Sequence, residues 1–207
     1  MSLTKKSKKG PFTLGITGTI ASGKSSAGKI LQELGVPVID TDHIVHEILA
    51  QDPTVKKAVK DRFGEEVLTN EGKIDREKLG KVVFSDHEAK KSLEAIVHPA
   101  TIMQCRKLIE EKNDNPVVAI LVPLLFEARL ESEYDEIWTI FTDEAILKER
   151  LAKRNGLDSV EIEKRLGAQM SQNEKVMRAD HVIDNSDSLE NTRNQIKTLL
   201  SKISGEA

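Results

Sequence analysis

A segment near the N-terminus has the residue types and spacing of a phosphate-binding loop. Residues 15–26 read GITGTIASGKSS, and the stretch from Gly18 to Ser25 satisfies G-x-x-x-x-G-K-[ST] at every fixed position. Glycine lets backbone N–H groups curl around a phosphate without an interfering side chain. We expect Lys24 to reach the β and γ phosphates of a nucleotide and the Ser25 hydroxyl to coordinate Mg²⁺. The sequence therefore predicts a site for ATP and Mg²⁺.

The expected elements around this loop support that interpretation. An apolar strand over 12–17 precedes it, and a helix over about 23–34 follows, with its positive N-terminal end directed at the same anion. Further strands are expected at 36–39, 117–122, 136–141 and 181–183, with helices at about 143–155, 160–171 and 188–201. Strands that alternate with helices predict an α/β fold of the three-layer P-loop NTPase type with a mainly parallel sheet.

One long segment departs from this alternation. Residues 43–115 hold charged, helix-favouring stretches and no convincing strand. We interpret them as a helical insertion with breaks at Pro53 and near residues 84–86. Inserted segments in such folds usually shape the site of the acceptor substrate.

A phosphate loop identifies a nucleotide but not a reaction. The chain lacks the Asn-Lys-x-Asp segment of a regulatory GTPase, and residues 61–64 match D-x-x-G only by letters, after an amphipathic helical stretch. The strand at 117–122 ends in Pro-Leu-Leu without the Asp of a motor ATPase. These absences favour a compact kinase.

Carboxylates follow the second expected strand in the segment Asp40-Thr41-Asp42. Ligands of parallel α/β sheets bind beyond the carboxyl ends of the strands, so these side chains should face the phosphate loop. There Asp42 would orient and deprotonate an acceptor hydroxyl. The alternative is that these residues cap a helix that starts near His43. We expect His43 and His46 to lie on a helix surface and not to bind metal.

A basic segment at residues 148–156 suggests a lid. Arg150 and Arg154 are four residues apart on one helix face, which would overhang the nucleotide. Gly156 ends that helix, and Asp158 with Glu161 forms a capping pattern for the next one. The alternative is a solvated basic face without a catalytic role.

Composition limits the remaining possibilities. The 207 residues are 38% hydrophobic and 31% charged, with a formal net charge of −3, which does not suit a nucleic-acid-binding protein. The single cysteine, Cys105, excludes an intrachain disulfide, and we expect it to be buried on a helix. The longest apolar run, 117–126, is too short to span a bilayer. We expect a cytoplasmic protein.

Taken together, these segments resemble the dephospho-coenzyme A kinase family from about residue 13 to residue 196. The resemblance is carried by GTIASGKS at 18–25, GVPVIDTD at 35–42, EAIVHP at 94–99, VPLLFE at 122–127, KERLAKRNG at 148–156 and ADHVIDN at 179–185. It implies transfer of a phosphoryl group from Mg-ATP to the ribose 3′-hydroxyl of dephospho-coenzyme A, the last step of coenzyme A synthesis. It also implies a core (12–42, 116–155 and 179–203), a helical coenzyme A domain (43–115) and a lid (156–178).

The resemblance assigns roles residue by residue. Asp42 falls on the family's base, Arg150 on its γ-phosphate arginine, and the segment around Asn185 on its adenine site. The family's phosphate loop falls on Ala21, Ser22, Gly23, Lys24, Ser25 and Ser26. His98 falls on a motif of the helical domain, although by itself it would be an ordinary helix-end residue.

The chain departs from the family where glycine is common at positions 19 and 21, alanine at 41 and aspartate at 155; it has Thr19, Ala21, Thr41 and Asn155 there. The fixed motif positions are intact. Two other readings are a different P-loop kinase, such as a nucleoside monophosphate kinase, and a catalytically silent nucleotide-binding module. Asp42 and the lid arginines argue against the second.

Overall fold

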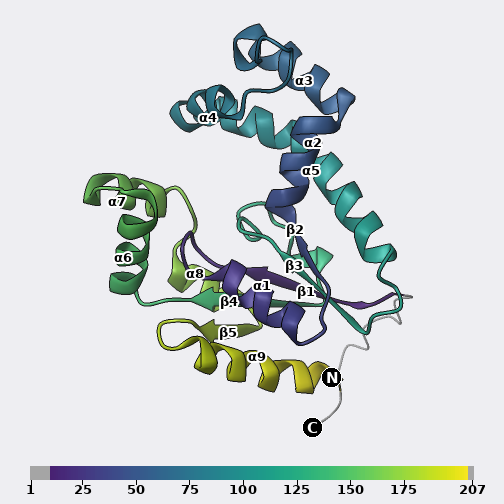
Figure 1. Cartoon of the computed structure of the whole chain (residues 1–207), viewed down its shortest axis with the longest axis vertical. Coiled ribbons are helices and arrows are strands. Elements are labelled where there is room, and N and C mark those ends of the chain that lie inside the picture. The colour runs from purple at the N-terminus through teal and green to yellow at the C-terminus, as the bar shows by residue number, and fades with distance from the viewer. Residues whose placement is uncertain (1–9, 205–207) are drawn as a thin grey trace. The chain divides into compact units, whose positions relative to one another are not determined.

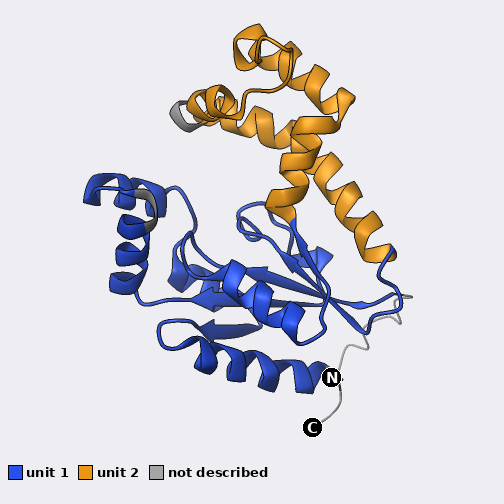
Figure 2. Ribbon diagram, in the orientation of Figure 1, with its two compact units in different colours: residues 1–40, 111–207 blue, residues 41–110 orange. Residues whose placement is uncertain are grey.

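The computed structural model describes residues 10–204, apart from the side chains of Phe84, Ser85, Arg154, Asn155 and Ser204. The chain divides into two compact units, coloured separately in Figure 2: residues 1–40 with 111–207, and residues 41–110. The first unit carries the phosphate loop, and the second is the segment that interrupts the alternation of strands and helices.

A parallel sheet forms the centre of the first unit (Figure 1). Its strands are β1 (Phe12–Thr17), β2 (Val38–Asp40), β3 (Val117–Leu121), β4 (Glu136–Phe141) and β5 (His181–Asp184). The order across the described sheet is β2-β3-β1-β4-β5, and every pairing is parallel. The predicted fold class is therefore confirmed. Because β1 lies between β3 and β4, the loop that follows it opens where the strand order reverses, the usual ligand position of such sheets.

Two helices pack against one face of this sheet, α1 (Lys24–Glu33) and α9 (Leu189–Ser204). Alternate strand residues point at them, as the pleat of a strand requires. The buried apolar residues that join the strands to these helices are Leu14, Ile16, Ala27, Ile30, Leu31, Val117, Ala119, Leu121, Trp138, Ile140, Ile183 and Ile196. This core fixes the N-terminus of α1 directly beyond β1.

Three further helices, α6 (Glu144–Asn155), α7 (Ser159–Gly167) and α8 (Gln172–Arg178), and the 3₁₀ turn η2 (Glu131–Glu133) also belong to the first unit. The prediction of a single helix over 160–171 is wrong, because α7 ends at Gly167 and a separate helix, α8, starts at Gln172. Ser171 is the N-cap of α8 and forms a capping box with Glu174. A side chain that satisfies the free N–H groups of a new helix favours a restart at this position.

The second unit is helical. It contains α2 (Thr41–Gln51), α3 (Pro53–Phe63), the 3₁₀ turn η1 (Glu65–Val67), α4 (Arg76–Ser85) and α5 (His87–Glu110). The predicted breaks are confirmed, since Asp52 caps α3 ahead of Pro53 and α4 ends before Asp86. The long helix α5 packs against α2, α3 and α4, and Cys105 is buried on it as expected.

Several predicted boundaries differ from the structure. The second strand starts at Val38, two residues later than expected, and the next helix starts at Thr41, ahead of the predicted start near His43. The interpretation of His98 as a helix-end residue is wrong. It lies in the interior of α5, which continues through Pro99. Packing against three helices outweighs the backbone hydrogen bond that a proline removes.

Candidate active site

The loop from Gly18 to Gly23 joins β1 to α1 and adopts a backbone that only glycine fits at two positions. Gly18 has φ 148° and Gly23 has φ 101°. A Cβ at Gly18 would lie 2.5 Å from Ser22 Oγ and 2.7 Å from the Ile140 carbonyl oxygen. A Cβ at Gly23 would overlap the Asn185 amide. The backbone conformation and the close neighbours of this loop therefore require glycine at both positions.

Ala21 occupies a position that glycine would fill without strain. Its φ is 63°, in the left-handed region, where a residue with a Cβ costs roughly 1–2 kcal/mol. Its side chain and that of Ile20 pack against a small apolar cluster from α6 and α7. The chain thus accepts local strain at this position and gains apolar contacts there.

The loop collects groups that suit a chain of phosphates. The Lys24 ammonium donates hydrogen bonds to the carbonyl oxygens of Gly18 (2.7 Å) and Thr19 (3.0 Å), so its charge lies over the loop. Gly23, the N-cap of α1, has no side chain to cover the first N–H groups of that helix. Within the described residues, the buried hydroxyls of Thr19 and Ser22 have no hydrogen-bond partner. Cationic and N–H donors at a helix N-terminus form an anion site.

Ser25 and Ser26 lie in the first turn of α1, where Ser25 is exposed and Ser26 is half-buried. Ser25 can therefore offer its hydroxyl oxygen to a cation held by a bound nucleotide. In the described part of the chain, no three or more His, Cys, Asp or Glu side chains cluster as a metal site. The role of the Ser25 hydroxyl as a metal ligand stays a prediction.

Arg150 lies on α6 and reaches the end of the sheet. Its Nη1 donates to Thr142 Oγ1 (3.2 Å), and its Nη2 donates to the Asn185 carbonyl oxygen (2.9 Å). Both acceptors are uncharged, and among the described side chains no carboxylate forms an ion pair with it. A guanidinium whose charge is not neutralised beside a phosphate loop is suited to bind an anion. Arg154 is on the same helix, and its side chain lies outside the described residues.

Asn185 follows β5 and supports the loop through its side chain. Its Nδ2 donates to the Ser22 carbonyl oxygen (2.8 Å), and its Oδ1 accepts a hydrogen bond from Thr192 (3.0 Å). Asn185 has 3% exposure, and both the Nδ2 and the Oδ1 of its amide are hydrogen-bonded to other protein groups. The predicted adenine contact would therefore fall to the backbone or neighbours of Asn185, and it stays a prediction. Thr142 Oγ1 donates to the same Ser22 oxygen at 2.8 Å.

The sequence reasoning did not identify Thr142, although one signal was available. Thr142 follows β4 as Gly18 follows β1 and Asn185 follows β5, so the rule of strand carboxyl ends would have included it. The structure thus brings together Lys24, Arg150 and Asn185 of the predicted residues, with Thr142 between them.

The two predicted carboxylates lie at a boundary in the chain. Asp40 is the last residue of β2, in the first unit, and Asp42 lies in the first turn of α2, in the second unit. Both are exposed. The approach of Asp42 to the phosphate loop stays a prediction. His43 and His46 are exposed on α2, as expected for helix-surface residues; His43 lies 3.4 Å from Glu47, and His46 contacts Arg76.

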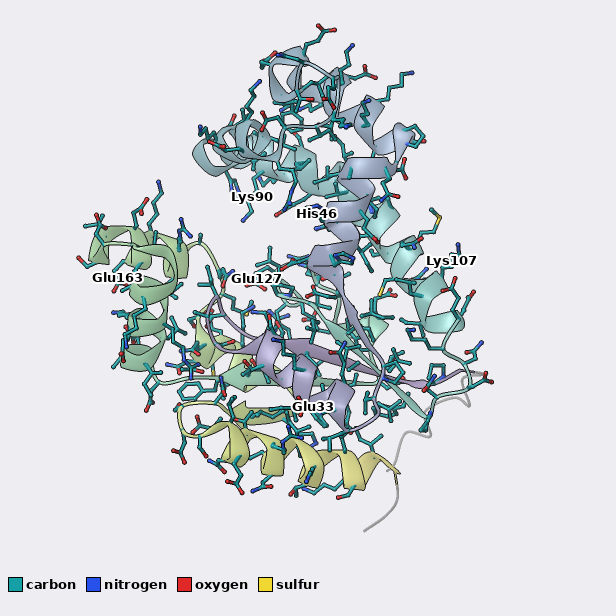
Figure 3. The ribbon with its side chains drawn as sticks, viewed as in Figure 1. Glu33, His46, Lys90, Lys107, Glu127 and Glu163 are labelled. Atoms are coloured by element: carbon teal, nitrogen blue, oxygen red, sulfur yellow. The ribbon has the colours of Figure 1, made fainter. Side chains whose placement is uncertain are left out.

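An ion pair joins α6, the helix that carries Arg150, to α7. Lys148 on α6 pairs with Glu144 (2.6 Å) and with Glu163 on α7 (2.5 Å), and Glu163 is labelled in Figure 3. Hydrogen bonds to Glu144 and Glu163 raise the pKa of Lys148 above its ordinary value. The apolar side chains of Leu147, Leu151 and Ile162 also join the two helices.

Helix α8 is anchored by a buried lysine. Lys175 has 0% exposure, and its Nζ donates to both oxygens of Glu127 (2.8 and 2.9 Å) and to the Pro123 carbonyl oxygen (3.1 Å). Glu127, labelled in Figure 3, comes from the loop after β3 and also accepts the Met170 N–H at 2.9 Å. The segment from Met170 to Lys175 is therefore fastened to the core.

Similarity to known proteins agrees with this site. A sequence model of the dephospho-CoA kinase family matches residues 12–191. A dephospho-CoA kinase of Carboxydothermus hydrogenoformans is 46% identical over 191 residues, 91% of this chain and 93% of that protein. No helix among the described residues is long and apolar enough to cross a membrane.

Solved structures agree as well. A crystal structure from Thermus thermophilus superposes with a TM-score of 0.82 and 34% identity, covering 94% of this chain and 98% of that one. The dephospho-CoA kinase of Campylobacter jejuni gives a TM-score of 0.62 and 28% identity, covering 92% and 96%. P-loop kinases use a nucleotide, and the chain shares their fold and motif. The chain therefore belongs to the dephospho-CoA kinase family.

Proposed function

We propose that this protein transfers the γ-phosphoryl group of ATP to the ribose 3′-hydroxyl of dephospho-coenzyme A, giving coenzyme A and ADP. Family membership supports the substrate. The arrangement of Lys24 over the loop carbonyls, at the N-terminus of α1, is the observation that carries the nucleotide site. This last step of coenzyme A synthesis would take place in the cytoplasm.

The charged groups would divide the transfer between them. Lys24 binds the β and γ phosphates, and Arg150 leaves its two neutral acceptors to neutralise charge on the transferring group. The Ser25 hydroxyl would hold Mg²⁺, which would supply positive charge beside the phosphates. Asp42 orients the 3′-hydroxyl and accepts its proton as the new P–O bond forms and the bond to ADP breaks. Arg154 would assist from the same helix as Arg150.

The segments of the chain would have matching roles. The core carries ATP on the phosphate loop, with Asn185 and Ser22 holding its shape. The helical segment 43–115 would bind the coenzyme A moiety. Residues 156–178 would act as a lid, in which α7 is the part that moves, because α8 is anchored by Lys175.

Side-by-side acceptor assays test this proposal. ADP release is measured with dephospho-coenzyme A, AMP and shikimate as acceptors at equal concentration. Of these three acceptors, we expect turnover only with dephospho-coenzyme A. Turnover that is fastest with AMP or shikimate would assign the chain to another kinase activity, and binding of ATP without turnover on any acceptor would indicate a silent nucleotide-binding module.

A further inference from the structure

A side chain from the segment between α7 and α8 contacts the phosphate loop directly. The Gln169 side-chain oxygen Oε1 accepts a hydrogen bond from the backbone N–H of Ile20 at 2.9 Å. Ile20 lies in the loop, two residues after Gly18. The N–H groups of this loop are those that a phosphate-binding backbone uses. Gln169 thus fixes the direction of one peptide unit of the loop.

The same part of the loop also has apolar contacts with a cluster formed by α6 and α7. The side chains of Ile20 and Ala21 pack against the cluster of Leu147, Leu151 and Ile162, which α6 and α7 contribute. One loop residue, Ile20, is therefore held in two ways: its backbone N–H is bonded to Gln169, and its side chain packs against the cluster that α6 and α7 form. Movement of α7 away from this cluster would remove the Ile162 side of it and would displace the chain that leads to Gln169, which follows the end of α7 by two residues.

A second glutamine, Gln172, links this segment to Thr142, which supports the loop. Gln172 accepts the Thr142 N–H (3.1 Å) and donates to the Thr142 carbonyl oxygen (2.9 Å). Thr142 Oγ1 in turn donates to the carbonyl oxygen of Ser22, another residue of the loop. Since Lys175 anchors α8 to Glu127, Gln172 is held in place, and Gln169 is three residues before it. The segment 169–172 therefore contacts the loop directly at Ile20 and, through Thr142, at Ser22.

We propose that Gln169 and Ile20 are positioning residues that couple the docking of α7 to the phosphate-binding shape of the loop. ATP that binds the supported loop would then favour docked α7, and docked α7 would favour ATP by the same factor, because coupling between two sites is reciprocal. The inference rests on the proposed nucleotide site and adds a coupling to it. A contact that serves only folding would lower stability without changing ATP affinity in the folded protein.

Gln169→Met tests the coupling, because it keeps the length of the side chain but removes the acceptor for the Ile20 N–H. We expect the dissociation constant of ATP, measured by titration calorimetry without an acceptor, to rise about 5- to 10-fold, at the lower end of typical coupling factors. We also expect ATP to protect the amides of α7, residues 159–167, from hydrogen exchange in the wild type and less so in the variant.

Two further variants make the result specific. Ile20→Ala removes the apolar contact but keeps the backbone N–H, so it should also raise the dissociation constant, and the double variant should lose less than the product of the two factors. Thr101→Val is the control. It removes a buried hydrogen bond to the Val97 carbonyl oxygen (2.8 Å) within α5, in the second unit, and should leave ATP binding within about twofold.

Two outcomes would overturn the inference and leave the proposed function intact. One is a Gln169→Met enzyme that binds ATP as tightly as the wild type and keeps the protection of α7. The other is a rise in the dissociation constant that Thr101→Val reproduces, which would assign the effect to general destabilisation. If the wild type itself binds no ATP, the proposed nucleotide site fails, and the inference fails with it.

Discussion

Replacing Lys175 by methionine should destabilise the first unit by about 3 kcal/mol. Removing one partner of a buried ion pair costs about 3–5 kcal/mol, because the other charge is left without compensation. The lower end applies here, since the Glu127 side chain keeps 24% exposure and still accepts the Met170 N–H. For a chain of this size the loss corresponds to a fall in Tm of roughly 6–12 °C.

The assay can be confined to the unit that carries the pair. Trp138 is the single tryptophan of the chain, lies in β4 and has 0% exposure, so its fluorescence reports on unfolding of the first unit. Urea unfolding followed at this residue gives the free energy of unfolding. Lys153→Met is the control, because it removes an exposed pair with Glu149 and should leave the midpoint unchanged.

A double variant separates charge from packing. Lys175→Met combined with Glu127→Gln removes both charges and keeps an acceptor for the Met170 N–H, so it should recover at least half of the loss. The reasoning is refuted if Lys175→Met lies within about 0.5 kcal/mol of the wild type, the range of an ordinary surface substitution. It is refuted equally if the double variant is no more stable than the single one.

Three substitutions test the proposed chemistry, each with circular dichroism to show that the variant folds. Lys24→Ala should lower kcat by at least ~10²–10³ through loss of the preorganised cation, and near-normal kcat would reject the phosphate-loop assignment. Arg150→Ala should lower kcat by ~10³–10⁵ with little change in the KM of the acceptor; an unchanged kcat would favour the solvated-face alternative. Asp42→Asn should lower kcat by ~10²–10⁴ while the ATP dissociation constant stays the same. An active Asp42→Asn beside a folded but inactive Asp40→Asn would mean that Asp40 is the base.

The features that the sequence revealed are those written in local patterns. The glycines and lysine of the loop have fixed spacing because phosphate binding constrains consecutive backbone units. The strand β3 is apolar at every position because both faces of a parallel sheet are covered. Helix starts were visible where a side chain caps them, as Asp158 does for α7.

The features that the sequence did not reveal depend on partners far along the chain. Gln169 pairs with a residue 149 positions away, and Lys175 with one 48 positions away, so no periodicity points to either contact. Helix α8 was missed because the seven residues from Gln172 to Arg178 are too few for a clear helical period. The interior position of His98 was missed because Pro99 reads locally as a break, whereas the packing of α5 decides the outcome.

The identity and position of the phosphorylated product test the central claim most directly. The protein is incubated with ATP labelled in the γ-phosphate, Mg²⁺ and dephospho-coenzyme A, and the labelled product is isolated and analysed by mass spectrometry and phosphorus NMR. We predict one labelled phosphate per ADP released, carried on the ribose 3′-oxygen, in a product that coelutes with coenzyme A. Label found only in inorganic phosphate, or on another oxygen of the acceptor, would contradict the account.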